Sequence, residues 1–248
     1  TYITIMSLKE KFLSNICSKR VLVDYRTSKE SIREMKQLGM TVYKTTPIKS
    51  LYKEVSGHPD MQIHFIGNKA ICAPEVYNFY KSYNFADIKL ISGSQYLKSD
   101  YPDDTAYNVC AFGKYVVLRP LSTAIEILSE YHSLKKEILS VKQGYAKCSI
   151  CVVNEESVIT ADNGIYNTLK NKGINVLKIN EGFIDLYGMQ GFIGGASGLI
   201  NKKTLCFNGD LKSHPDCDNI TSFCKNVGVD TVSLNKGNLI DIGSILCF

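Results

Sequence analysis

A histidine and a carboxylate two residues apart are the strongest chemical signal in this chain of 248 residues. The segment Gly57-His58-Pro59-Asp60 stands just before an apolar run. A histidine of near-neutral pKa can exchange a proton with a reacting group, so His58 is a candidate general acid or base. A carboxylate binds a planar cation through paired hydrogen bonds, so Asp60 is a candidate for binding such a group. The same segment also suits a plain turn in which Pro59 fixes the bend.

A second polar segment, residues 101–108, precedes the next apolar run. It contains the adjacent acids Asp103 and Asp104 and ends at Asn108. These three residues are candidates for binding a cationic substrate, because they stand in the same place relative to a strand as His58 and Asp60. A turn is the alternative interpretation of this segment.

A nucleophile is harder to assign from the sequence. Ser197 lies in the Gly-rich stretch 191–198, and Cys247 lies one residue from the chain end. Serine needs an adjacent base to become a good nucleophile, whereas cysteine is intrinsically better. Cys247 is also compatible with a packed strand residue. Small residues at 194–198 would let the backbone approach a ligand or a neighbouring strand, since the Lys-Ser/Thr ending of a phosphate-binding loop is missing.

The sequence predicts no metal site and no cofactor. Cys148 and Cys151 form a lone CxxC pair, and a structural zinc site usually needs four ligands. The nine cysteines are odd in number and irregularly spaced, which indicates reduced and mostly buried thiols in a cytoplasmic protein. The triplet beginning at His214 and the segment beginning at Asp162 each precede a helical pattern, so helix capping explains their acids better than ligand binding.

Composition narrows the range of partners. The net charge is +5 with scattered lysines, which argues against nucleic acid binding. No run approaches the ~20 apolar residues of a membrane helix. Residues 8–16 are expected to form a short amphipathic helix rather than a signal peptide. A small-molecule ligand is therefore the expected partner, and the sequence leaves the oligomeric state open.

The elements that position these residues recur along the chain. A short apolar strand, a turn, a second strand, a helical stretch and a third strand follow one another with a period of about 40–50 residues, which is typical of a repeat architecture. The approximate repeats are 19–47, 62–93, 108–144, 148–181 and 191–237. Repeat one lacks the leading strand. Residues 238–248 are expected to supply it by pairing with 21–24, which would close a ring and remove exposed strand edges.

Five strand-strand-helix-strand units in a ring resemble the pentein, or guanidino-modifying enzyme, superfamily. The resemblance covers nearly the whole chain, and Gly57-His58-Pro59-Asp60 is similar to the Gly-His-x-Asp signature of its deiminases. It implies an α/β fold, a five-fold pseudosymmetric α/β propeller forming one domain over residues 1–248. A doubly wound nucleotide-binding fold is the alternative, but it requires a Gly-rich turn after the first strand, and residues 23–28 contain none.

The resemblance also implies roles. His58 would be the general acid/base, and Asp60 would hold the substrate guanidinium. The family nucleophile is a cysteine late in the chain after a Gly-rich approach, so Cys247 or Ser197 would take that place. Two functions follow as hypotheses: a hydrolase or transferase acting on a guanidino or amidine small molecule, and a catalytically inactive pentein that binds a small cationic ligand or a macromolecule.

Overall fold

A computed structural model describes residues 20–248 of the protein, so the helix expected over residues 8–16 lies outside the described part. The secondary structure alternates strands and helices in five successive units. Unit one contains β1 (Arg20–Val23), α2 (Lys29–Gln37) and β2 (Thr41–Lys44). Unit two contains α3 (Pro59–Gln62), β3 (Ile63–Ile66), β4 (Lys69–Cys72), η1 (Pro74–Val76), α4 (Tyr77–Ser82) and β5 (Lys89–Ser92). Unit three contains β6 (Cys110–Phe112), β7 (Tyr115–Leu118), α5 (Ile125–Ser133) and β8 (Glu137–Ser140).

The C-terminal half continues the pattern with one insertion. Unit four contains α6 (Ala146–Ser149), β9 (Ile150–Val152), β10 (Ser157–Thr160), α7 (Asn163–Asn171) and β11 (Asn175–Lys178). A small hairpin of β12 (Asp185–Leu186) and β13 (Met189–Gln190) follows. Unit five contains β14 (Ser197–Asn201), β15 (Thr204–Phe207), η2 (Leu211–Ser213), α8 (Cys217–Asn226) and β16 (Asp230–Ser233), and the chain ends after β17 (Leu246–Cys247).

Each unit builds the same three-stranded sheet. The orders are β17-β1-β2, β3-β4-β5, β6-β7-β8, β9-β10-β11 and β14-β15-β16. In every sheet the first strand pairs antiparallel with the middle strand, and the third pairs parallel with it after a helical crossover. As predicted, β17 supplies the first strand of unit one: Cys247 is opposite Val21 and Leu246 is opposite Leu22.

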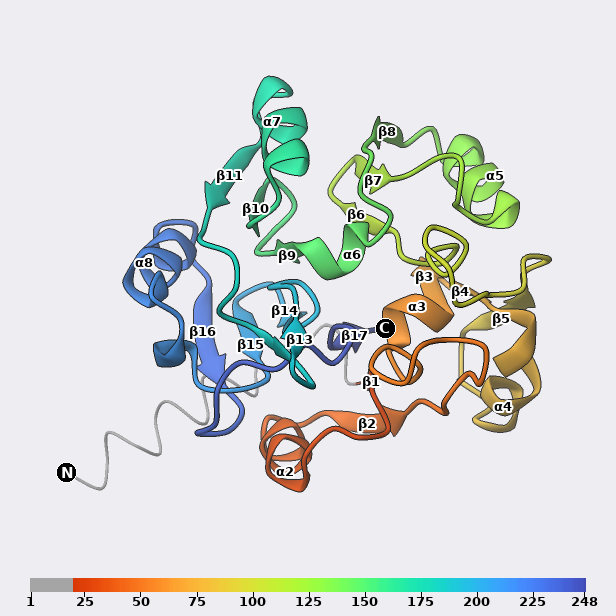
Figure 1. The fold of residues 1–248 in the computed structure, drawn as a ribbon, viewed down its shortest axis with the longest axis horizontal. Coiled ribbons are helices and arrows are strands. Elements are labelled where there is room, and N and C mark those ends of the chain that lie inside the picture. Colours follow the sequence, from red (N-terminus) through yellow and green to blue (C-terminus); the bar gives the residue numbers. More distant parts are fainter. Residues whose placement is uncertain (1–19) are drawn as a thin grey trace.

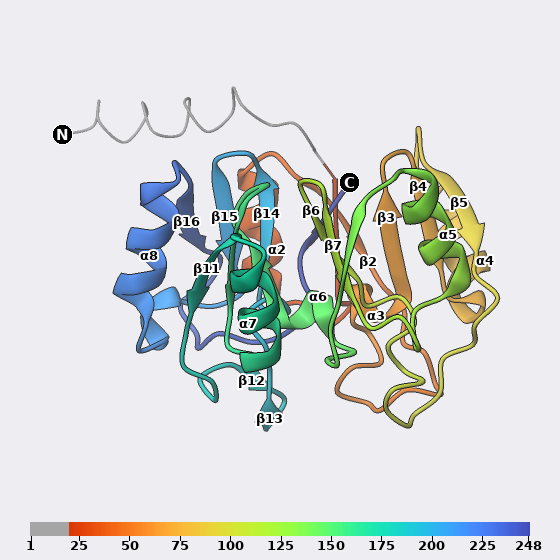
Figure 2. The ribbon, with the colours of Figure 1, turned by 90° about the horizontal axis from the view of Figure 1, so that it is seen from above.

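The helices that cross between strands lie at the periphery, and the first strands lie toward the middle (Figure 1). Helices α2, α4, α5, α7 and α8 are outermost, whereas α3, α6 and β17 lie near the centre. Among residues 20–248 the five sheets share no strand, and hydrogen bonds of the segments around them link the units. Figure 2 shows the hairpin β12–β13 at one face of the molecule and the C-terminus at the opposite face.

The middle strands are buried on both faces, which explains their continuous apolar sequences. Val21, Leu22 and Val23 of β1 are fully buried, as are Leu205, Cys206 and Phe207 of β15. The crossover helices carry apolar residues at helical spacing. In α7, for example, Ile165 and Leu169 are buried while Asp162 caps the helix by accepting a hydrogen bond from the Ile165 amide at 2.7 Å. The predicted capping role of Asp162 is therefore confirmed.

Several first strands begin later than the predicted repeats do. The repeats at 108–144 and 148–181 were expected to start with a strand, but β6 and β9 each begin two residues in, and within 238–248 only β17 near the end is a strand. The residues in front of these strands form turns or short helices instead. No helix in the described part of the chain combines the length and the apolar character that crossing a bilayer requires.

Candidate functional site

Three short segments that each precede a first strand meet near the middle of the molecule. They are His58 with α3, α6, and the loop 239–245 before β17. The segments are tied together by backbone hydrogen bonds: the Asp60 amide donates to the Gly243 carbonyl at 3.2 Å, and the Gly195 amide donates to the Cys148 carbonyl at 2.9 Å. Side chains from all three segments therefore converge although they lie far apart in sequence.

Cys148 lies at the centre of this convergence. Its thiol sulfur is 3.1 Å from Asp60 Oδ2, to which it donates, and 3.1 Å from Asn108 Nδ2. Burial raises the pKa of the Cys148 thiol well above its usual range, and the carboxylates of Asp60 and Asp241 raise it further, while the hydrogen bond from Asn108 opposes the shift. The free protein therefore keeps this thiol protonated at neutral pH.

His58 is buried beside Asp241 with no hydrogen-bond partner on either ring nitrogen. Its Nδ1 lies 3.8 Å from Asp241 Oδ1. Buried polar atoms are rarely left unpaired, so an imidazole with two free nitrogens indicates a position for a ligand or a reacting group. Asp241 is held by the amides of Phe192 and Gly243, each donating at 2.9 Å. Burial raises the pKa of the Asp241 carboxyl, the charge of His58 lowers it, and Asp60 raises it.

Ser244 also holds Asp60 in place, and Lys147 in turn holds Ser244. Ser244 Oγ donates to Asp60 Oδ2 at 2.7 Å, and Lys147 Nζ donates to Ser244 Oγ at 2.9 Å. Asp60 Oδ1 has no hydrogen-bond partner although it is buried. The carboxylate therefore has one oxygen committed to the protein and one available for a ligand.

The strand register explains why Asp60 and Lys147 lie together. Ile63 is opposite the last residue of β4, and Ile150 is opposite the last residue of β10. Asp60 and Lys147 each come three residues before those positions, so they occupy equivalent places in units two and four. One is an acid and the other a base, which lets them approach each other through Ser244 without charge repulsion.

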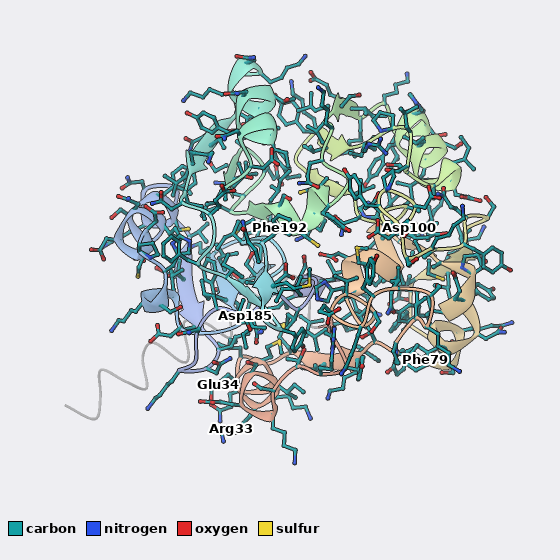
Figure 3. All side chains as sticks on the ribbon, in the orientation of Figure 1. Arg33, Glu34, Phe79, Asp100, Asp185 and Phe192 are labelled. Atoms are coloured by element: carbon teal, nitrogen blue, oxygen red, sulfur yellow. The ribbon has the colours of Figure 1, made fainter. Side chains whose placement is uncertain are left out.

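A pocket of about 410 Å³, the His58 pocket, opens beside these groups. His58, Cys148 and Asp241 line it together with Glu54, Gln190 and apolar side chains. Phe192, which Figure 3 labels, lies toward the middle of the molecule and is one of the apolar residues, whereas the labelled Arg33, Glu34 and Phe79 lie at the periphery. The volume suits a small molecule.

A second cavity of about 210 Å³, the Cys247 cavity, lies among the first strands. Asp60, Lys147, Ser197 and Cys247 line it, together with His64 and residues of β3, β6, β9, β14 and β17. Ser197 is buried, donates to the Gly194 carbonyl at 3.4 Å and has a side-chain hydrogen bond with Cys151. Burial raises the pKa of the Cys247 thiol to about 12. The two nucleophiles suggested by the sequence thus line a different cavity from His58.

The remaining sequence candidates lie around the site. Asn108 contacts Cys148, and its Oδ1 accepts from the Lys147 amide at 2.7 Å. Asp104 is buried and accepts a hydrogen bond from the hydroxyl of Tyr145, a residue of the His58 pocket. Burial raises the pKa of the Asp104 carboxyl, and the Tyr145 hydrogen bond lowers it. Asp103 instead forms an exposed ion pair with Lys98 at 2.8 Å.

Sequence reasoning missed Cys148 and Asp241. The CxxC pair predicts buried thiols, and residues 238–248 predict a closing strand rather than a loop that carries a site residue. Both residues carried a signal: Cys148 lies in the short segment before a first strand, next to the position equivalent to Asp60, and Asp241 interrupts an apolar run. His58, Cys148 and Asp241 are also a set that could hold a metal ion, because one ligand atom from each lies within 4.8 Å of the other two.

The fold resembles solved structures of guanidino-modifying proteins. DDAH (dimethylarginine dimethylaminohydrolase) from Pseudomonas aeruginosa, complexed with citrulline, matches with a TM-score of 0.59 and 8% identity over 93% of this chain and 99% of that one. An agmatine deiminase from C. jejuni with substrate bound matches with a TM-score of 0.55 and 10% identity over 99% and 87%. An amidinotransferase of saxitoxin biosynthesis from Microseira wollei matches with a TM-score of 0.53 and 11% identity over 88% and 89%.

These similarities show that the chain has the fold of the pentein superfamily, as its sequence predicts. The chain belongs to the family described as "Family of unknown function (DUF6873)", whose model matches residues 22–246. Comparison with curated proteins gives no match.

Proposed function

We propose that the protein is a hydrolase or amidinotransferase that acts on a guanidino or amidine small molecule in the His58 pocket. The observation that carries the proposal is the approach of Cys148, His58 and Asp241, whose sulfur, ring nitrogen and carboxylate oxygen lie within 4.8 Å of one another beside a buried pocket. A nucleophile, a general acid/base and a carboxylate at this spacing suit attack on a cationic carbon.

In this proposal the Cys148 sulfur attacks the central carbon of the bound guanidinium. As the carbon–sulfur bond forms, the Cys148 thiol gives its proton to His58, and His58 passes that proton to the departing amine as the carbon–nitrogen bond breaks. In a hydrolase, water then loses a proton to His58 and adds to the same carbon. The carbon–sulfur bond breaks, the sulfur takes that proton back from His58, and a ureido product and the free thiol result. In a transferase, an acceptor amine replaces the water.

The substrate itself would activate the nucleophile. The carboxylates of Asp60 and Asp241 raise the pKa of Cys148 in the free protein. A bound guanidinium would offset both negative charges, and a nearby cation favours the thiolate. The free Oδ1 of Asp60 supports the role of guanidinium ligand that the sequence assigns to this residue.

Two alternatives remain in the proposal. Cys247 or Ser197 would be the nucleophile if the substrate entered the Cys247 cavity, which Asp60 lines, whereas Asp60 reaches the His58 pocket only through its contact with Cys148. A catalytically inactive binding protein is the other alternative, and the raised pKa of Cys148 favours it, because a protonated thiol is a poor nucleophile.

A turnover screen with matched variants distinguishes these alternatives. The purified chain is incubated with alkylguanidines, arginine derivatives and amidines, and release of ammonia or amine and formation of ureido products are followed. We expect turnover that is lost in Cys148→Ser and His58→Ala and kept in Cys247→Ser. Loss in Cys247→Ser alone would move the chemistry to the other cavity, and no turnover of any compound would favour the binding protein.

We also propose that the five units are pseudosymmetric blades of one propeller and that residues 1–248 form one domain. The shared strand order of the five sheets supports both proposals. A reducing, cytoplasmic environment is supported by the eight cysteines in the described part of the chain, all of which are unpaired.

A further inference from the structure

The chemistry of the His58 pocket changes from its floor to its mouth. The floor is formed by His58, Cys148 and Asp241, which are buried. The two unpaired ring nitrogens of His58 and the acidic neighbour show that the floor is built to meet a polar, cationic group. That the ligand has a cationic end rests on the function proposed above.

The walls above the floor are apolar. Val55 and Tyr52 come from the loop before α3, Leu186 and Met189 come from the hairpin β12–β13, and Phe192 follows that hairpin. Tyr52 and Met189 are 58% and 59% exposed, so they form the rim rather than the interior. An arm that leaves the cationic group and runs toward the mouth would contact these side chains, and an apolar arm would gain free energy from the contact.

The part of the pocket lining that the structure describes has no Lys or Arg to offset a negative charge. Its remaining charged wall residue is Glu54. Arg26, on a neighbouring loop, is committed elsewhere. It donates to Asp24 Oδ2 at 2.6 Å and to the Glu54 carbonyl at 2.8 Å, and its guanidinium lies 4.4 Å from the centre of the Tyr187 ring. Lys147 is bonded to Ser244 and lines the Cys247 cavity.

We propose that the ligand of this pocket is an amphipathic cation, a guanidinium or amidinium on an apolar arm that carries no carboxylate. A carboxylate on the arm would be desolvated against the apolar wall without a cationic partner, and Glu54 would repel it. Both the desolvation and the repulsion oppose binding. A second positive charge at the end of the arm is compatible with Glu54. The substrate class is thereby narrowed to guanidines without an amino-acid or acid terminus.

Binding to the Cys148→Ser variant tests this proposal without turnover. Calorimetry compares hexylguanidine with 4-guanidinobutyrate, which has the same head group and an acidic end, and with agmatine, which has an ammonium end. We expect hexylguanidine to bind at least about tenfold more tightly than 4-guanidinobutyrate. Glu54→Gln should weaken agmatine binding and leave hexylguanidine unchanged. Equal or tighter binding of the acid, or no binding of hexylguanidine, would overturn the proposal.

A rim substitution provides the second test in a chain that keeps its Cys148 site. Met189 is exposed, so Met189→Lys should fold, and it places a cation where the wall has none. We expect the preference for hexylguanidine over the acid to fall about tenfold in this variant. An unchanged preference would contradict the proposed wall. If hexylguanidine binds but no guanidine is consumed by the unsubstituted protein, the catalytic proposal fails while the ligand class stands. If the unsubstituted protein consumes only guanidines with an acidic end, the proposed ligand class fails and the catalytic proposal stands.

Discussion

The thiol of Cys148 lies 3.1 Å from a carboxylate oxygen of Asp60, and the same oxygen accepts a hydrogen bond from Ser244 at 2.7 Å. Residues separated by 88 positions thus share one buried contact. Burial is the largest cause of the raised thiol pKa, and Asp60 is the next. The reactivity of Cys148 therefore depends on whether a cation offsets Asp60.

Asp60→Asn should make Cys148 more reactive in the ligand-free protein. Removing the carboxylate lowers the thiol pKa, and a fall of one unit increases the thiolate fraction about tenfold at a pH below the pKa. The measurement is the rate at which iodoacetamide alkylates Cys148 at pH 8, followed by peptide mass analysis. Asp103→Asn is the control because Asp103 pairs with Lys98 at the surface, and its rate should match that of the unsubstituted protein. A slower rate in Asp60→Asn would contradict the assigned cause.

Gly243→Ala should disturb His58. Gly243 has φ +67°, and a Cβ at this position would overlap Cβ of His58. Gly173 has φ +73° with open space around it, so Gly173→Ala reports the backbone strain alone. We expect both variants to lose about 1 kcal/mol of unfolding free energy from strain, with Gly243→Ala losing about 1–3 kcal/mol more from the overlap. Urea unfolding measures the difference, and equal losses would show that His58 is not held against Gly243.

Ser244→Ala and Ser149→Ala form a matched pair. Both serines are buried: Ser149 ends α6 just before β9, and Ser244 lies in the loop before β17. Ser244 Oγ forms hydrogen bonds with Asp60 and Lys147, whereas Ser149 Oγ has no hydrogen-bond partner. Hydrogen bonds to charged groups contribute about 1.5–3 kcal/mol, so Ser244→Ala should reduce the unfolding free energy by that amount. Ser149→Ala should be close to neutral. Similar unfolding midpoints for the two variants would argue against the Lys147–Ser244–Asp60 network.

Stability should fall in alkaline solution because of buried thiols. Burial raises the pKa of Cys110 to about 12, above the unfolded value near 9. The folded state therefore keeps this proton at pH values where the unfolded state loses it. The contribution of Cys110 to stability is complete below roughly pH 9 and falls by about 1.4 kcal/mol per pH unit up to the folded pKa.

Cys110→Ala removes this titration, so its unfolding free energy should decline less steeply between pH 8 and 10 than that of the unsubstituted protein. Cys217→Ala is the control, because Cys217 is only partly buried. The slopes of free energy against pH are compared rather than the absolute values, since the alanine variant also loses packing. Parallel slopes for Cys110→Ala and the unsubstituted protein would contradict the assigned pKa.

Most of the fold could be predicted from the repeat pattern in the sequence. The alternation of apolar strands and turns at a fixed period depends on local residue types, so all five sheets and the pairing of β17 with β1 could be predicted. Strand ends were less predictable. Residues 146–149 and 239–245 have strand-like composition, but they turn inward because their polar side chains bond across units, as Asp241 does with the Phe192 amide.

The candidate site could be predicted only where one segment held a complete motif. His58 and Asp60 are two residues apart in sequence; His58 lines the His58 pocket, and Asp60 contacts Cys148. Cys148 joins them from α6 and Asp241 joins them from the loop before β17, through tertiary contacts that no local pattern encodes. The roles of Ser197, Cys247, Asp103, Asp104 and Asn108 in catalysis or binding stay predictions.

We propose Cys148 as the nucleophile for a cationic, amidine-type ligand, and affinity labelling tests this role. The protein is treated with a haloacetamidine, which joins an amidinium to an alkylating carbon, and the modified residue is mapped by mass spectrometry with and without excess hexylguanidine. We expect Cys148 to be modified, hexylguanidine to suppress the modification, and His58→Ala to abolish it because His58 takes the thiol proton. Modification of Cys247 in preference to Cys148, or labelling that ignores the guanidine, would contradict this role.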